Sequence, residues 1–225
     1  MQNEKITPVI KAVISALFDE NAYLIGLPDG QECVIVDPGL EPDEIFDEIQ
    51  RQKWQPVAIL NTHGHADHIA GNGAMKDRWP DCPLIIGAGD ASKLTDPVGN
   101  LSADYGVPLT SPPADRLVRE GDVLELAGLR WEVLETPGHC SGHIVFVARQ
   151  TTPVLIVGGD VLFSGSVGRS DFPDSDPAAL EASIKNKLFK FPDDAVVLPG
   201  HGPPTTIGEE KRSNPFVGEG ATFEW

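Results

Sequence analysis

The sequence lacks the features that mark several large protein classes. It has only three cysteines and no CxxC pair, so neither a disulfide framework nor a thiolate zinc site is indicated. No stretch approaches the roughly 20 consecutive apolar residues that a membrane helix needs. Charges interrupt the apolar stretch near the N-terminus, so it does not make a signal-peptide core. These absences predict a cytoplasmic protein in a reducing compartment.

Positive charge is also scarce. The 17 lysines and arginines are outnumbered by 34 aspartates and glutamates, which gives a formal net charge of -17 at pH 7. A field of that sign opposes binding to phosphate backbones and to anionic membrane surfaces. No basic, aromatic-rich segment offsets it. We therefore expect a small-molecule partner, no nucleic acid and no membrane, while the oligomeric state stays open.

Apolar patterning predicts strands in both halves of the chain, with helices between them. The expected strands are 8–18, 22–27, 32–39, 56–62, 82–88, 122–128, 129–135, 143–149, 153–159 and 195–200. The expected helices are 41–54, 65–79, 177–191 and a short one at 207–214. Strands followed by a helix and more strands suggest sheets covered by helices. The loop-like region near 100–116 is either a seam between two halves or a long loop over a site.

Five of the six histidines fall in one recurring pattern. Residues 62–68 read THGHADH, which places four candidate ligands within six residues, directly after an apolar strand. His63 and His65 can point to the same side of an extended segment, whereas Asp67 and His68 are adjacent and project differently. One loop can therefore supply two ligands to each of two neighbouring ions.

The pattern recurs in a looser form in the second half. His139, Asp160 and His201 each follow an apolar strand and a turn of small residues. Strand ends that converge on one edge of a sheet sandwich are a natural way to build a rigid metal site.

The ligand types and their number indicate two ions. Imidazole and carboxylate without thiolate suit zinc, iron or manganese, and seven ligands are too many for one tetrahedral ion. Asp160 is the natural bridge because a carboxylate has two oxygens. The first ion is assigned to His63, His65 and His139, and the second to Asp67, His68 and His201.

Four segments resemble the metallo-β-lactamase superfamily over nearly the whole length: HGHADH, TPGHCSGH, GGDVLFSGSVGRSDF and LPGHGPPTTIGEEKRSNPF. GRSDF, PGHGPPTTIGEE and NPF are the narrower motifs, and they are similar to the short, glyoxalase II-like branch of hydroxyacylglutathione hydrolases. The resemblance implies an α+β fold, a four-layer αββα sandwich of two packed mixed β-sheets with helices on the outer faces. It implies a single domain over 1–225 with two pseudo-symmetric halves. It also implies the metal grouping above, with Asp160 as the bridge.

The expected activity is hydrolysis of an acyl thioester such as S-lactoylglutathione by a metal-bridging hydroxide. Asp160 and Asp67 are the expected catalytic carboxylates, and Asp160 is placed to accept the second proton of the nucleophile. A leaving thiolate with a pKa of about 8.5 departs without a strong general acid, and none is evident near the ligands. Two divalent ions are expected, with zinc first and iron or manganese as alternatives.

Other activities of the same superfamily stay open. A mononuclear iron persulfide dioxygenase would share a GR[ST]DF segment, but those enzymes usually lack the PGHG found here at 199–202. The ligands do not exclude a lactonase or another ester hydrolase. Larger glyoxalase II enzymes carry a basic C-terminal extension for the glutathione carboxylates, whereas here only Lys211 and Arg212 are cationic after His201. Whether glutathione is recognised is therefore open.

Several residues near the motifs have two interpretations. His143 is interpreted as an ordinary strand residue in preference to a partner of a ligand. Asp37 either orients a ligand histidine or makes a turn, and Cys140 is expected to point away from the metals. Arg169 and Asp171 are expected to form a structural ion pair.

Two basic clusters could meet an anionic substrate tail. The run 185–190 contains three lysines and is most simply a solvated helix face. Lys211 and Arg212 are most simply surface charges paired with Glu209 and Glu210.

Overall fold

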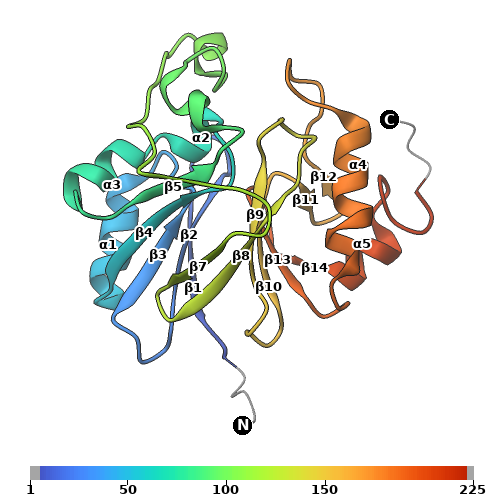
Figure 1. Cartoon of the computed structure of the whole chain (residues 1–225), viewed down its shortest axis with the longest axis horizontal. Helices are drawn as coiled ribbons and strands as arrows, with labels where there is room; N and C mark the ends of the chain where they lie inside the picture. Colours follow the sequence, from blue (N-terminus) through green and yellow to red (C-terminus); the bar gives the residue numbers. More distant parts are fainter. Residues whose placement is uncertain (1–5, 222–225) are drawn as a thin grey trace.

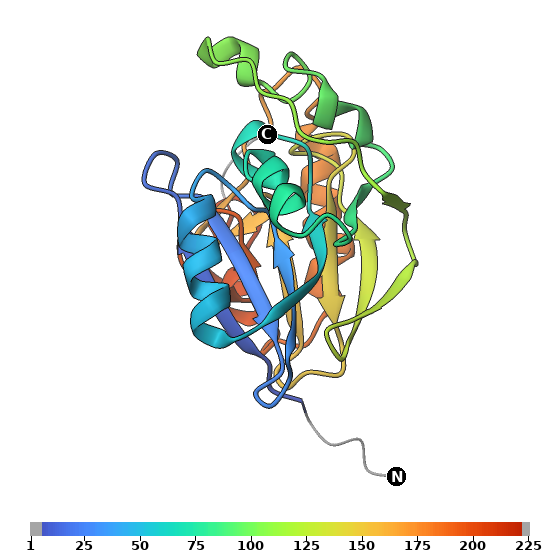
Figure 2. The same ribbon diagram turned by 90° about the vertical axis from the view of Figure 1, so that its left-hand side faces the viewer.

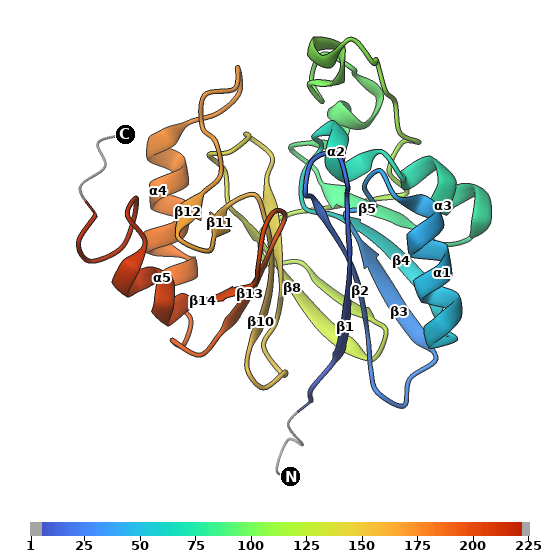
Figure 3. The same cartoon turned by 180° about the vertical axis from the view of Figure 1, so that it is seen from behind.

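The computed structural model describes residues 6–221. Two six-stranded sheets pack face to face, and helices cover the outer face of each sheet (Figure 1). The same order is seen from behind in Figure 3, and Figure 2 looks onto the first half, with its helices in front of the first sheet. This is the αββα sandwich expected from the resemblance. Within residues 6–221, every helix is too short or too polar to cross a membrane.

The first sheet keeps its strands in sequence order. Its members are β1 (Val9–Ile14), β2 (Asn21–Gly26), β3 (Glu32–Val36), β4 (Gln55–Asn61), β5 (Leu84–Gly87) and β6 (Arg116–Val118). The first two pairings are antiparallel and the last three are parallel. The parallel crossovers need covering helices, which are α1 (Pro42–Gln52), α2 (Ala66–Ile69) and α3 (Asn72–Arg78).

The second sheet has the order β14-β13-β10-β9-β8-β7. Its strands are β7 (Val123–Leu126), β8 (Leu129–Glu135), β9 (Ile144–Ala148), β10 (Leu155–Gly159), β13 (Val196–Pro199) and β14 (Thr205–Thr206). Only β10 and β13 are parallel. Its outer elements are the hairpin β11 (Leu162–Phe163) and β12 (Ser166–Val167), α4 (Pro177–Asn186), the 3-10 turn η3 (Leu188–Lys190) and α5 (Ile207–Ser213).

The two main helices of the second half begin where the sequence offers a cap. Asp176 caps α4, because its side chain accepts a hydrogen bond from the backbone N–H of Ala179. Pro177 follows it as the first residue of the helix, a position that suits proline. Thr206 does the same for Glu209 at the start of α5. The N-termini of α4 and α5 are therefore fixed locally, and their apolar faces are free to pack on the sheet.

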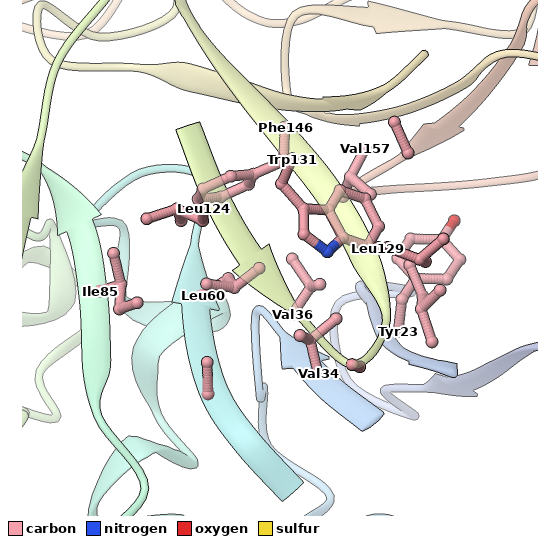
Figure 4. Close-up of a cluster of buried hydrophobic side chains, with 14 of the residues drawn as sticks. Tyr23, Val34, Val36, Leu60, Ile85, Leu124, Leu129, Trp131, Phe146 and Val157 are labelled. Carbon is pink, nitrogen blue, oxygen red and sulfur yellow. The ribbon is translucent and has the colours of Figure 1, made fainter. Parts of the chain in front are cut away.

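The largest apolar cluster lies between the two sheets. Figure 4 shows Trp131 and Phe146 of the second sheet beside Val36 and Leu60 of the first, all of them buried. Alternation along each strand sends one set of side chains into this layer and the opposite set towards the helices. The outer clusters complete the core on both sides.

The two halves are also joined by polar contacts at one end. The Asn21 side chain donates hydrogen bonds to the carbonyl oxygens of Pro199 at 3.0 Å and Gly202 at 2.8 Å. The Tyr23 hydroxyl donates to the same Pro199 oxygen at 2.8 Å. Strand β2 of the first sheet therefore fixes the turn that carries His201.

The region near 100–116 differs in part from the expected seam. Strand β6 still belongs to the first sheet, and the chain passes to the second sheet only at residues 119–122. The preceding segment contains the 3-10 turns η1 (Ala91–Thr95) and η2 (Ser102–Tyr105) and rises beside α2 (Figure 1). The long-loop interpretation therefore describes 100–115 better. A three-residue edge strand gives too short a pattern to detect in the sequence.

Candidate metal centre

Strand polarity brings the conspicuous motifs to one edge of the sandwich. The carboxyl ends of the parallel strands β3, β4 and β5 share an edge, and the chain leaves β4 directly into the THGHADH turn. In the second sheet, Asp160 follows β10 and His201 follows the parallel strand β13. His139 lies between β8 and β9, at the same edge because these strands are antiparallel. Ligand-bearing turns at the carboxyl ends of strands are the common location of sites in such folds.

All seven predicted ligands meet there. Their candidate donor atoms form three overlapping groups, and within each group the atoms lie within 4.8 Å of one another. The groups are His63, His65 and His139; His63, His68 and Asp160; and Asp67, His68 and His201. The first and third are the two trios expected from the sequence. The second joins them through Asp160.

In the first trio, oxygen atoms outside the cluster orient two of the three rings. His63 Nδ1 lies 3.1 Å from the hydroxyl of Thr62. His139 Nδ1 donates to the backbone carbonyl of Arg169 at 2.8 Å. His139 Nε2 then faces His65 Nδ1 at 2.9 Å, so both nitrogens point to the same space. A fixed outer nitrogen leaves the inner lone pair directed at a metal.

The second trio is oriented in the same manner by different groups. His68 Nδ1 lies 3.2 Å from the carboxylate of Asp37, which also accepts hydrogen bonds from the backbone and hydroxyl of Thr62 at 2.8 and 2.7 Å. His201 Nδ1 donates to the carbonyl of Phe18 at 3.0 Å. Asp37 thus orients a ligand histidine, the first of its two interpretations.

Asp160 lies between the trios. Its carboxylate oxygens are 3.5 Å from His68 Nε2, 3.6 Å from His139 Nε2 and 3.4 Å from His201 Nε2. Its backbone N–H donates to His143 Nε2 at 3.0 Å, and His143 Nδ1 lies 2.8 Å from the hydroxyl of Thr136. His143 is therefore a buried hydrogen-bond partner of Asp160, which favours the second of its two interpretations, a partner of a ligand. Spacing alone could not show this, because the contact joins the residue before β9 to the residue after β10.

The donor set fits divalent metal ions. His63 Nε2, His68 Nε2 and Asp160 Oδ1 are buried and have no hydrogen-bond partner among the described residues. Unpaired buried polar atoms are costly and rare, so a cluster of them indicates a ligand. Gly200 keeps the space open, since a Cβ there would lie 2.1 Å from Asp160 Oδ1 and 2.7 Å from His68 Cε1.

The protonation equilibria of the two trios differ. Burial lowers the pKa of His63, His65 and His139, and neighbouring imidazoles lower it further for the first two. Burial also opposes a charge on His68 and His201, but adjacent carboxylates outweigh it and raise the pKa of both, to about 10 for His201. In the absence of metal, these shifts favour neutral imidazoles in the first trio and protonated imidazoles at His68 and His201.

Sequence reasoning missed a buried charge cluster behind the first trio. The Asp90 carboxylate accepts hydrogen bonds from the backbone of Gly64 at 2.8 Å, the backbone of Gly142 at 3.0 Å and the thiol of Cys140 at 3.1 Å. Lys93 lies 3.1 Å from Asp90 and 2.7 Å from Asp174. Asp90 thus ties the turn of His63 and His65 to the turn of His139. Cys140 points to Asp90, in agreement with its expected orientation away from the metals.

A second missed residue lies beside the other trio. Glu20 is buried close to His68 and His201, and burial raises the pKa of its carboxyl well above the usual value. Its backbone bridges that of His201. No motif surrounds Asp90 or Glu20 in the sequence, so neither carried a signal beyond its residue type.

The cluster forms the floor of a pocket of about 710 Å³. Five of the seven candidate ligands line it, and most of the other lining side chains are apolar. Those apolar side chains are Leu17, Phe18, Leu40, Ala66, Leu101, Tyr105, Val107, Leu109, Phe163 and Phe172. A mostly apolar pocket with a few convergent polar groups is typical of a small-molecule site.

The basic residues considered from the sequence lie elsewhere or are already paired. Lys185 pairs with Glu181 and Lys187 with Glu120, and neither lysine lines the pocket. Arg212 pairs with Glu209 as expected, but Lys211 pairs with Asp193 instead of an α5 glutamate.

Arg169 does line the pocket. Its guanidinium makes the expected ion pair with Asp171, through two hydrogen bonds of 2.9 and 3.0 Å.

Comparisons with known proteins agree with this geometry. A family model of the metallo-β-lactamase superfamily matches residues 16–201. The chain is 35% identical over 211 residues to the hydroxyacylglutathione hydrolase GloC of Haemophilus influenzae, covering 92% of this chain and 97% of that protein. It is similar to the crystal structure of the BLEG-1 B3 metallo-β-lactamase, with a TM-score of 0.87, 34% identity and coverage of 93% and 99%. It is also similar to TTHA1623 in a di-iron-bound form, with a TM-score of 0.80, 37% identity and coverage of 92% and 100%.

The family model spans most of the chain, and the structure brings the histidines and aspartates of its motifs into one cluster suited to divalent metal ions. The chain belongs to the metallo-β-lactamase superfamily of metal-dependent hydrolases.

Proposed function

We propose that the protein hydrolyses an acyl thioester at a centre of two divalent metal ions, and that S-lactoylglutathione is the first substrate to test. One observation carries the proposal. Buried nitrogen and oxygen atoms without hydrogen-bond partners cluster together, and two of the residues that carry them, His65 and Asp160, line a pocket that can hold a small molecule. The relative GloC, named a hydroxyacylglutathione hydrolase, supports the choice of substrate class.

The allocation of residues follows the two trios. His63, His65 and His139 would hold one ion, and Asp67, His68 and His201 the other. Asp160 would contact both, because its carboxylate lies within 3.6 Å of histidines from each trio. When bound, such a pair of ions lowers the pKa of a water molecule to about 7 and polarises a carbonyl oxygen.

The chain's own residues orient the site and accept protons. Burial opposes ionisation of Asp160 and Asp67, but the neighbouring imidazoles, those of His68 and His201 foremost, together outweigh it and lower the pKa of both carboxyls. Both are therefore ionised at neutral pH, so Asp160 can accept a proton from the attacking nucleophile. The hydrogen bond from its backbone to His143 holds Asp160 in place as it does so.

The pocket supports a thioester over an amide. Outside the seven ligands, the titratable residues that line it are Arg169 and Tyr105, and Arg169 is held by Asp171. A thiolate leaving group has a pKa of about 8.5 and departs without a donated proton, whereas an amine does not. A strong general acid is thus not required for this substrate class.

Zinc remains our first proposal for the metal, with iron or manganese as alternatives, because imidazole and carboxylate suit all three. The di-iron-bound form of TTHA1623 makes iron worth equal attention in the assay. We also propose a cytoplasmic location, which agrees with the three buried free thiols.

The test combines elemental analysis with a substrate panel. The protein is reconstituted separately with zinc, iron and manganese, and its metal content is measured. Each form is then assayed with S-lactoylglutathione, simple acyl thioesters, a lactone and a β-lactam, and for oxygen uptake with glutathione persulfide. We expect two ions per chain and thioester turnover without oxygen uptake. One iron per chain with persulfide-dependent oxygen uptake would replace this proposal by the dioxygenase alternative.

A further inference from the structure

The wall above the metal cluster is built from apolar side chains that are far apart in the sequence. Leu17 and Phe18 come from the turn between β1 and β2, and Tyr105 and Val107 come from the loop between β5 and β6. The Phe18 and Tyr105 rings make an edge contact, with centroids 5.7 Å apart. Two loops of the first half therefore form one continuous wall.

Aromatic rings continue this surface down to the ligands. Phe172 lies in edge contact with His65 and His139, at centroid distances of 5.2 and 5.5 Å. Phe163 lies 6.0 Å from the ring of His201, a member of the other trio. A substrate whose carbonyl reaches the metal cluster would thus lie between hydrophobic surfaces.

Exposed apolar side chains are concentrated at the mouth of this pocket. Among residues 6–221, six large apolar side chains are strongly exposed, and three of them line the pocket. These three are Leu17 at 74% exposure, Tyr105 at 61% and Val107 at 69%. Clustered exposure of this kind marks a binding surface, while single exposed apolar residues do not.

Charge complementarity to a tripeptide thiol is poor. Glutathione carries two carboxylates, yet Arg169 is the one lysine or arginine among the described lining residues. Its guanidinium already makes two hydrogen bonds to Asp171 and lies 4.5 Å from the Phe172 ring centroid. An anionic group entering here would compete with Asp171 for that guanidinium.

We propose that this wall, formed by Leu17, Phe18, Tyr105, Val107, Phe163 and Phe172, binds an uncharged apolar chain of the substrate. The protein is then selective for thioesters with an alkyl or aryl substituent over thioesters of glutathione. This inference rests on the proposed thioester hydrolysis for its catalytic consequence. The binding surface itself is tested independently of turnover.

The first experiment measures binding without reaction. Alkyl thioethers cannot be hydrolysed, so butyl, hexyl and octyl thioethers of the neutral thiol N-acetylcysteamine are titrated into the metal-loaded protein by calorimetry, beside S-hexylglutathione. We expect affinity to rise about three- to fourfold per methylene, with a negative heat-capacity change. S-hexylglutathione should bind no better than the hexyl thioether of the neutral thiol. If affinity did not depend on the length of the alkyl group, the proposal would be overturned. A pocket covered by a second copy of the protein would give that result.

The second experiment uses matched variants. Leu17→Ser and Val107→Ser remove apolar surface inside the pocket, whereas Ile14→Ser and Val98→Ser remove it from comparably exposed positions outside. The pocket variants should weaken octyl thioether binding about tenfold and flatten its dependence on chain length. The outside variants should bind as the unaltered protein does. Equal effects in both sets would contradict the assignment of this wall.

Turnover measurements then test the proposed function and the apolar specificity separately. They also show whether the wall binds the acyl side or the thiol side of the substrate. Acyl thioesters of N-acetylcysteamine with two to ten carbons are compared with acetyl thioesters of alkyl thiols of the same lengths, and with S-lactoylglutathione. A rise of kcat/KM in one series identifies the acyl or the thiol side as the chain that the wall binds. Thioether binding without any thioester turnover would reject the proposed function alone. Turnover that favours S-lactoylglutathione over every alkyl series would reject the apolar specificity alone.

Discussion

The two ends of the metal cluster differ in the chemistry that surrounds them. The trio of His63, His65 and His139 is all imidazole, and burial keeps its pKa values low. The trio of Asp67, His68 and His201 contains a carboxylate, and the pKa values of its two imidazoles are raised. One end is ready to bind a cation at neutral pH, while the other must first lose protons. We therefore expect the two ions to bind in order, the first more tightly at low pH.

Asp160→Ala should have the largest effect, because it removes the one carboxylate of residues 6–221 that lies close to histidines of both trios. We expect metal content to fall below two ions per chain and activity to fall by more than about a hundredfold, beyond the loss typical of an outer partner. Elemental analysis and a thioester assay measure the two quantities. Asp194→Ala is the matched control, since it removes an exposed carboxylate that does not line the pocket. Two retained ions with full activity would remove Asp160 from the bridging role.

Asp37→Asn should separate the two ends. The carboxylate of Asp37 contacts His68 and no histidine of the first trio. We expect the affinity for the second ion to fall about ten- to a hundredfold while the first is retained. Competition with a chelator, followed ion by ion, measures this. Asp29→Asn, at an exposed turn, is the control. Equal losses of both ions would show that the two ends are not independent.

Asp90→Asn should weaken binding of the ion held by His63, His65 and His139, by a smaller factor than Asp37→Asn weakens the other ion. Asp90 ties together the turns of Gly64 and Gly142, which carry the first trio, and it pairs with the buried Lys93. An asparagine keeps one acceptor oxygen, so we expect a loss of about 1–3 kcal/mol in unfolding free energy and a weaker first ion. Chemical denaturation of the metal-free protein gives the first value. An unchanged affinity for the first ion, together with a lower affinity for the second, would contradict the role assigned to Asp90 beside the first trio.

Proton release should give the smallest signal of the comparison. His201 has a pKa of about 10 in the metal-free protein, so it carries a proton at pH 7 that a metal must displace. Affinity for the second ion should therefore rise with pH, whereas the first trio is already neutral and its affinity should be nearly constant between about pH 7 and 8. Calorimetric titrations in buffers of different ionisation enthalpy count the protons. Proton release on binding of the first ion instead of the second would show that the ions bind in the opposite order.

The apolar patterns predicted sheets covered by helices, and the resemblance to a known family supplied the four-layer sandwich. Strands such as β4 and β10 are buried over most of their length, and their apolar runs stand out in the sequence. The elements that the sequence did not reveal, β6, β11, β12 and β14, have only two or three residues each. A period cannot be recognised over so short a stretch.

The candidate ligands could be predicted from the sequence, but most of the residues around them could not. Histidines in a dense motif stand out by composition, and strand polarity then brings them together. Asp90 and His143 act through contacts with residues 17 to 52 positions away, which spacing cannot reveal. The apolar wall was hidden because loop residues such as Tyr105 and Val107 carry no periodic pattern. Their role exists only where the two loops meet.

The turn at residues 119–122 is exposed and is where the chain passes from one sheet to the other. Each half folds a complete sheet with its own covering helices, and the interface is the apolar layer around Trp131, closed at one end by Asn21 and Tyr23. The protein is consequently suited to being produced as two fragments divided at this turn. Neither fragment would carry a complete trio, since each trio takes residues from both sides of the turn. Recovery of metal binding on mixing would therefore report reassembly of the two fragments.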